Sequence, residues 1–105
     1  MQVDQEGTYH FGLYRIKIED FHEMNTEYIT IRSRHEGDHV TLDSNHHKKV
    51  SRLMIDAKVP TQLREQMPIV ETLNGDILAV GTLYVRKQYE KFIKIQFLGD
   101  DKDEK

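Results

Sequence analysis

An Asn-Gly dipeptide, Asn74-Gly75, is the feature that most constrains how this chain can fold. It stands between two runs rich in β-forming residues, Ile69–Leu73 and Ile77–Val80. Asn-Gly suits the positive-φ positions of a two-residue hairpin turn, whose twist matches that of the flanking strands. The pattern therefore predicts an antiparallel hairpin. Gly81 follows it, and there we expect a bulge or a close approach of the backbone.

The other predicted strands are rich in β-branched or aromatic residues, or alternate between apolar and polar residues. We expect them at residues 11–18, 28–34, 40–42, 83–85 and 92–97. Polar or charged segments between them predict a connection at 20–26, a turn at 36–38 and a loop at 86–91.

One amphipathic helix is predicted near the middle of the chain. Four apolar residues recur at helical spacing and are expected to face the core: Val50, Leu53, Met54 and Ala57. Ser44 or Asn45 is the expected N-cap of this helix. The helix should end before Pro60, because proline disfavours helical geometry at the residue before it.

A second, shorter helical turn is expected at Gln62–Gln66, because Thr61 can cap it and Pro68 stops it. Taken together, the pattern predicts an α+β fold with mainly antiparallel strands and one central helix. We expect a single domain over residues 1–98 and a disordered, charged tail over residues 99–105.

The composition of the 105 residues excludes several classes of protein. Cysteine is absent, so disulfides and thiolate chemistry are excluded. No apolar run approaches the roughly 18 residues that span a bilayer, and the polar segment 1–7 does not have the composition of a signal peptide. We expect a cytoplasmic protein that does not enter membranes. The sequence also contains no Gly-rich phosphate loop, nucleophile elbow or cysteine-based zinc motif, so we expect no catalysis by this chain.

The histidines and aspartates do not predict a catalytic or metal site. His35 and His39 are separated by a predicted turn, and His46 and His47 are adjacent in sequence. We expect surface histidines and no bound metal. The aspartates that could pair for acid/base chemistry are expected to be cap, turn and surface residues: Asp38, Asp43 and Asp56.

Positive charge is concentrated in the middle of the chain, although the whole chain has a net charge of −3. Residues 32–64 contain seven basic and four acidic side chains, whereas residues 1–31 contain two basic and six acidic ones. Residues 65–105 contain six basic and eight acidic side chains. A local basic patch is the kind of surface that contacts a phosphate backbone, although a solvated surface also fits the pattern.

The order of several short motifs resembles the C-terminal domain of bacterial tRNA(Ile)-lysidine synthetase, also called tRNA(Ile)-lysidine synthase. The resemblance covers about residues 28–97 and rests on these motifs: Arg32-Ser33-Arg34, Gly37-Asp38, Lys48-Lys49, Asp56-Ala57-Lys58-Val59-Pro60, Arg64, Pro68, Gly75, Ile77-Leu78 and Gly81. The chain departs from the family pattern at Ala79, where tryptophan is frequent, and at Glu36, where proline is frequent.

This resemblance implies a function. Such enzymes are ATP-dependent ligases that adenylate the wobble cytidine of an isoleucine tRNA with a CAU anticodon and then attach lysine. Both steps belong to an N-terminal catalytic domain with a Ser-Gly-Gly-x-Asp-Ser loop, which is absent from this sequence. The C-terminal domain helps to hold the tRNA. The implied partners are therefore tRNA(Ile) and that catalytic domain, with ATP bound in the parent enzyme and no cofactor bound here.

The resemblance and the basic block together predict the residues that contact tRNA. They are Arg32, Arg34, Lys48, Lys49, Arg52, Lys58 and Arg64. The two arginines of the Arg-x-Arg motif would share one face of a strand, and Lys48 and Arg52 would lie one turn apart on the helix. Such contacts position an RNA backbone and do not read bases.

Two other functions remain open at this stage. One is an editing-type domain of a phenylalanyl-tRNA synthetase β chain, which shares the fold family. The other is a protein-interaction or dimerisation domain that uses sheet edges, and a homodimer is a possible partner arrangement in that case.

Overall fold

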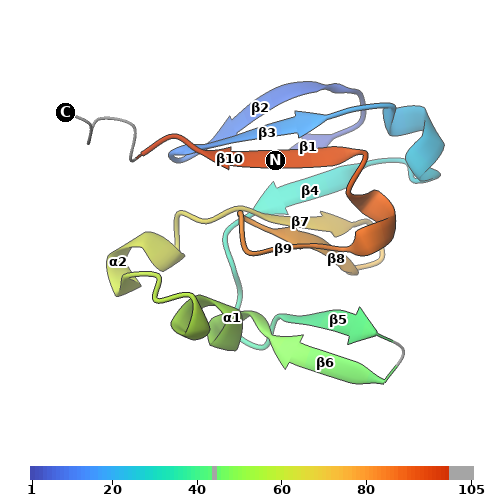
Figure 1. Ribbon diagram of the computed structural model, residues 1–105. Helices are drawn as coiled ribbons and strands as arrows, with labels where there is room; N and C mark the ends of the chain where they lie inside the picture. The colour runs from blue at the N-terminus through green and yellow to red at the C-terminus, as the bar shows by residue number, and fades with distance from the viewer. Residues whose placement is uncertain (44, 100–105) are drawn as a thin grey trace.

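The computed structural model describes residues 1–43 and 45–99, whose strands form three antiparallel sheets (Figure 1). The five-stranded sheet has the order β1 (Gln2–Val3), β4 (Ile29–Arg32), β7 (Ile69–Thr72), β8 (Ile77–Val80) and β9 (Tyr84–Val85). The three-stranded sheet has the order β10 (Ile93–Phe97), β3 (Tyr14–Ile18) and β2 (Gly7–Phe11). The third sheet is the pair β5 (His39–Asp43) and β6 (His46–Lys49).

Four short helices connect these strands in the described part of the chain. They are the α-helices α1 (Val50–Asp56) and α2 (Thr61–Arg64) and the 3-10 helices η1 (Phe21–Met24) and η2 (Lys87–Tyr89). The α+β class with antiparallel strands and a central helix is confirmed. Within the described residues, none of the helices is long and apolar enough to cross a membrane.

The core lies between the sheets and under α1. In Figure 1 the three-stranded sheet covers one side of the five-stranded sheet, and α1 with the β5–β6 hairpin lies toward the opposite end of the molecule. Successive side chains of a strand point to opposite faces of its sheet, so each strand turns one set of side chains toward the core. The bulkiest side chains with almost no exposed surface are Ile16, Ile18, Ile29, Ile31, Met54, Ile69, Leu78 and Ile93.

The hairpin predicted from Asn74-Gly75 is formed by β7 and β8. The Gly75 amide donates a hydrogen bond of 2.9 Å to the Thr72 carbonyl, and Gly75 has a φ of 90°. Gly81 allows the predicted close approach: its φ is 46°, and a Cβ built there would overlap the Met67 side chain.

The strand predicted at residues 11–18 is confirmed only for residues 14–18, because a turn at residues 12–13 divides the segment. Residues 7–11 and 14–18 are two strands that pair with each other, and Gly12 at the turn has a φ of 58°. The turn lies close to α2's end, where a Cβ on Gly12 would be 3.2 Å from the Gln66 carbonyl oxygen. Glycine therefore meets two local requirements, a left-handed φ and little space.

The predicted start of the central helix is wrong. Lys48 and Lys49 lie in β6, paired with Val40 and His39, and α1 begins at Val50. The N-cap is Lys49 in extended geometry, without a side-chain cap hydrogen bond. Asn45 lies in the turn between β5 and β6, and Ser44 lies outside the described residues.

Three smaller differences concern segment bounds and burial. Of the four apolar residues predicted to face the core, Val50 and Met54 are buried, Leu53 is partly buried, and Ala57 is an exposed C-cap. The second helix is Thr61–Arg64, with Pro60 at its N-cap position. The predicted tail falls almost entirely on residues 100–105, which lie outside the described residues.

Candidate nucleic-acid interface

The β5–β6 hairpin presents two different faces. Val40 lies opposite Lys48, and this face turns toward the core because Val40 is fully buried. His39 lies opposite Lys49 on the other face, next to the pair Thr41 and His47. The His39 and His47 rings are edge-to-face with centroids 5.4 Å apart. The outward face therefore carries an ammonium group beside two imidazoles.

Two hydrogen bonds fix the hairpin to its neighbouring segments, and a third lies within its own turn. The Val50 amide donates to the Asp38 carbonyl at 2.9 Å, which ties the start of α1 to the start of β5. The Tyr84 hydroxyl donates to the Thr41 carbonyl at 2.9 Å. The bulge between Thr41 and Asp43 ends the regular pairing, and the Asp43 carboxylate accepts a 3.0 Å hydrogen bond from the Asn45 amide. These bonds hold the outward face in one orientation.

Lys48 links β6 to the last turn of α1. Its Nζ lies 2.8 Å from Asp56 Oδ2, and the hydrogen bond from Lys48 holds the pKa of Asp56 below its usual value. The Lys48 side chain is about one-third exposed. It therefore lies beside a carboxylate and not on the free polar face of a helix.

Arg32 is engaged by two carboxylates. Its Nη1 and Nη2 donate to Asp38, and Nη2 also donates to Glu71 Oε1 at 2.9 Å. The hydrogen bond with Glu71 is the largest cause of the raised Arg32 pKa, burial opposes it, and Asp38 adds to it. The Arg32 side chain is only 16% exposed. In this arrangement its donors bind the protein's own carboxylates.

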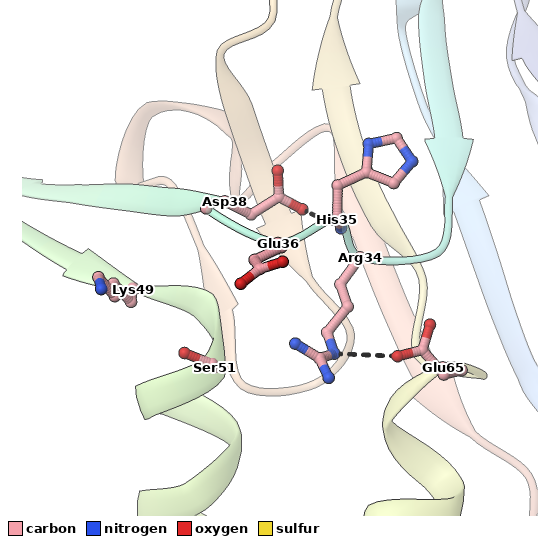
Figure 2. A pocket seen from close by; sticks show the side chains of 8 residues that line it. Arg34, His35, Glu36, Asp38, Lys49, Ser51 and Glu65 are labelled. Carbon is pink, nitrogen blue, oxygen red and sulfur yellow. Dashed lines mark hydrogen bonds and ion pairs between the residues drawn. The ribbon is translucent and has the colours of Figure 1, made fainter.

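Arg34 points away from this cluster into a hollow between α1 and α2. Its Nε lies 3.2 Å from Glu65 Oε2, in an ion pair whose geometry is not that of a hydrogen bond. Figure 2 shows the guanidinium between the segments that carry Ser51 and Glu65. The hollow has a volume of about 420 Å³, and its polar lining includes Lys49.

The structure thus brings Arg34 and Lys49 to one concave surface, and Arg52 follows Lys49 by one helical turn. Lys49 and Arg52 are exposed. Within the described part of the chain, neither has an ion pair. Arg52 lies close enough to Asp56 to help lower the pKa of that carboxyl group.

The two remaining predicted residues lie farther along the chain. Lys58 is exposed just after α1, with a left-handed φ of 60°. The Arg64 Nε donates a 3.0 Å hydrogen bond to the Val59 carbonyl, so this half-buried arginine closes the connection between α1 and α2. The seven predicted residues therefore do not form one continuous patch.

Sequence reasoning missed the neighbours of Lys49 on the hairpin face. His39 and His47 were expected only as surface residues, because the pairing of β5 with β6 was not predicted. Alternation of polar side chains across residues 46–49 is the signal that would have placed His47 beside Lys49. Across residues 1–43 and 45–99, no group of three or more histidine, aspartate or glutamate side chains could hold a metal ion.

Comparison with known proteins identifies the family. Residues 29–96 match the family described as the TilS substrate C-terminal domain. The chain belongs to this family. The match coincides with residues 28–97, where the ordered motifs suggested the C-terminal domain of tRNA(Ile)-lysidine synthetase, so that resemblance is confirmed.

Curated relatives of this TilS C-terminal domain are named tRNA(Ile)-lysidine synthase. One from Staphylococcus epidermidis is 37% identical over 100 residues, covering 94% of this chain and 23% of the relative. One from Staphylococcus aureus strain N315 is 39% identical over the same length, with the same coverage. One from Exiguobacterium sibiricum is 39% identical over 82 residues. The chain thus spans about a quarter of the length of the first two relatives.

A solved structure has the same fold. It is described as the crystal structure of the TilS C-terminal domain, with a TM-score of 0.67 and 21% sequence identity. The superposition covers 81% of each chain. The arrangement of sheets and helices described above is therefore the fold of a TilS C-terminal domain.

Proposed function

We propose that this TilS C-terminal domain binds the phosphate backbone of tRNA through Lys49, Arg52 and Arg34, which we call the helix-side basic surface. The observation that carries the proposal is that Lys49 and Arg34 line one polar hollow on the domain surface. Its lining also includes Glu36, Asp38 and Glu65, of which Asp38 is paired with Arg32 and Glu65 with Arg34. A guanidinium and an ammonium group are the side chains that bind phosphate oxygens most strongly. The substrate in the relatives' printed name, tRNA(Ile), is consistent with this ligand.

The geometry favours contact with an RNA backbone over base recognition. Arg34 and Lys49 border an open, polar concavity that contains the imidazole of His35 but no phenylalanine, tyrosine or tryptophan side chain. Base recognition in RNA relies largely on stacking against aromatic side chains or arginine planes, whereas stems are recognised through phosphates, 2′-hydroxyls and shape. The domain would therefore position a tRNA stem.

The chemistry belongs to another part of the parent enzyme in this proposal. This chain acts within a tRNA(Ile)-lysidine synthase, whose separate catalytic domain binds ATP and attaches lysine to the wobble cytidine. The chain spans about a quarter of such enzymes, and its residues contain no Ser-Gly-Gly-x-Asp-Ser loop. Its partners are the tRNA and the catalytic domain.

The test is tRNA binding by the variant Lys49→Gln/Arg52→Gln. Two lost phosphate contacts should weaken binding and lower the slope of log K against log salt by about 1.4–1.8. The matched control is Lys87→Gln/Lys91→Gln, which removes two positive charges from exposed positions away from the hollow. Equal binding and equal slopes for the two variants would contradict the proposal. Salt-insensitive self-association of the chain would favour a dimerisation domain instead.

A further inference from the structure

The outward side chains of the three-stranded sheet are polar, and the carboxylate of Glu19, just after β3, lies beside them. Strand alternation directs one set of side chains from β2, β3 and β10 outward, and all of them are exposed. They are Thr8, His10, Arg15, Lys17, Lys94 and Gln96. We call these six residues the outer sheet face. Three carry a permanent positive charge, and one is a histidine.

Cross-strand pairing brings these charges together from distant parts of the sequence. Lys17 on β3 lies opposite Lys94 on β10, and Arg15 lies opposite Gln96. The Arg15 Nη2 donates a 2.5 Å hydrogen bond to Gln96 Oε1. Directly opposite residues on one sheet face have Cβ atoms about 5 Å apart. Two like charges so close are unfavourable unless counterions or a bound anion accompany them.

The fold places both basic side chains of the acidic N-terminal segment on one surface. Residues 1–31 contain only two basic side chains, Arg15 and Lys17, and both lie on the outer sheet face. The six acidic residues of that segment all lie outside β2 and β3: Asp4, Glu6, Glu19, Asp20, Glu23 and Glu27. A segment that is negative in sum thus contributes both of its cations to one surface, where Glu19 lies beside Lys17.

The present partners of these side chains hold them weakly. Lys17 Nζ lies 3.4 Å from Glu19 Oε2, but both side chains are exposed, and such pairs contribute little. The Lys94 Nζ donates to the Glu90 carbonyl at 2.8 Å on the surface. The lining of a shallow hollow of about 350 Å³ includes Thr8, Arg15, Lys17 and Lys94. The cationic groups can therefore turn toward a ligand at low cost.

We infer that the outer sheet face is a second RNA-backbone contact, separate from the helix-side basic surface. Charge complementarity specifies the occupant, because a polyanion gains from three cations on one face, and the exposed pair of Lys17 with Glu19 opposes this only weakly. The two surfaces lie toward opposite ends of the molecule, with the five-stranded sheet between them (Figure 1). They would therefore hold two separate stretches of RNA stem. The inference shares with the proposed function only the premise that the chain binds RNA.

A short RNA duplex of about 12 base pairs tests this arrangement, because it can reach only one surface at a time. Titration of the whole chain should show two duplexes bound per chain. Lys17→Gln/Lys94→Gln should weaken binding at the outer sheet face on the order of tenfold and lower the salt slope there by about 1.4–1.8. Binding at the helix-side basic surface should not change. Lys87→Gln/Lys91→Gln is the matched control, with the same residue types and the same change in net charge.

The two possible failures can be told apart. If Lys17→Gln/Lys94→Gln binds two duplexes with the affinity and salt slope of the control, the outer sheet face is only solvated and the inference is overturned. That result leaves the helix-side surface untouched. If instead Lys49→Gln/Arg52→Gln matches the control while Lys17→Gln/Lys94→Gln loses binding, the inference holds and the proposed function of the helix-side surface fails.

Discussion

The Arg32 guanidinium and the Asp38 carboxylate are joined by two parallel hydrogen bonds, from Nη1 to Oδ2 at 2.9 Å and from Nη2 to Oδ1 at 3.1 Å. Asp38 Oδ2 also accepts a 2.7 Å hydrogen bond from the His35 amide. Because Glu71 binds the same guanidinium, this cluster connects β4, β7 and the start of β5. It fixes the start of the β5–β6 hairpin, which carries Lys49.

Removing Arg32 should therefore destabilise the fold. Arg32→Ala leaves Asp38 and Glu71 close together, partly buried and without their cation, and we expect a loss of about 2–4 kcal/mol in unfolding free energy. Urea denaturation measures this. The matched control is Arg34→Ala, whose ion pair reaches an exposed Glu65 and should contribute less than about 1 kcal/mol. Equal losses for the two variants would contradict the structural role of Arg32.

The Asp38 carboxylate should make stability depend on pH. Burial acts to raise its pKa, but the hydrogen bonds from Arg32 and from the His35 backbone hold the pKa below its usual value. The unfolded chain has the ordinary aspartate pKa of about 3.9. The contribution of the Asp38 carboxylate to the free energy of unfolding is therefore complete well above pH 4. It is lost as the pH falls through the lower, folded-state pKa.

The comparison variant for this pH dependence is Asp38→Asn, which cannot ionise. It should be less stable than the wild type at neutral pH and should lose less stability between about pH 5 and pH 3. Urea denaturation at several pH values gives both curves. Parallel curves for the two proteins would show that Asp38 does not stabilise the folded state through its charge.

Two adjacent residues of α1 should differ in their contribution to the core. Met54 is fully buried, so Met54→Ala should cost about 2–5 kcal/mol. Leu53, which the helical spacing predicted to face the core, is only partly buried, and Leu53→Ala should cost less than about 2 kcal/mol. Denaturant unfolding of both variants measures which loss of unfolding free energy is larger. A larger loss for Leu53→Ala would mean that α1 turns Leu53, and not Met54, toward the core.

Gly81 should tolerate no side chain. Gly81→Ala combines a left-handed φ with an overlap against Met67, and we expect a cost of about 2–4 kcal/mol. Gly37→Ala is the matched control, because Gly37 has a φ of 92° with nothing within 4 Å of a built Cβ. It should cost only the backbone strain, about 1–2 kcal/mol. Thermal unfolding that ranks the two variants equally would mean that Met67 moves aside freely.

Features with a local cause could be predicted from the sequence. The turn chemistry of Asn74-Gly75 acts within a few residues, and so does the helical spacing of Val50 and Met54. The β2–β3 hairpin was missed because Gly12-Leu13 is not a favoured turn dipeptide and its flanks both favour β structure. The strand at Lys48-Lys49 was missed because those residues have little intrinsic β preference. Hydrogen bonding to β5 stabilises this strand, although the intrinsic β propensity of its residues is low.

The candidate site could be predicted only in part, because its geometry depends on contacts between distant residues. The ordered motifs identified the family, and Lys49 and Arg52 are exposed as expected. The Arg32–Glu71 contact spans 39 positions, so the sequence could not reveal that this arginine is held by carboxylates. The outer sheet face combines side chains of β3 and β10. Both strands lie in segments whose summed charge is negative, so the charge sums did not predict a basic surface there.

The most direct measurement of the central claim is the affinity of the unaltered chain for a tRNA(Ile) transcript with a CAU anticodon, as a function of salt. If the domain binds the RNA backbone, log K should fall linearly with log salt, with a slope of roughly −2 or steeper. The measurement spans about 50–200 mM salt, where such contacts are most sensitive. Absence of binding at the lowest salt, or an affinity that does not change with salt, would contradict a backbone-binding role for this domain.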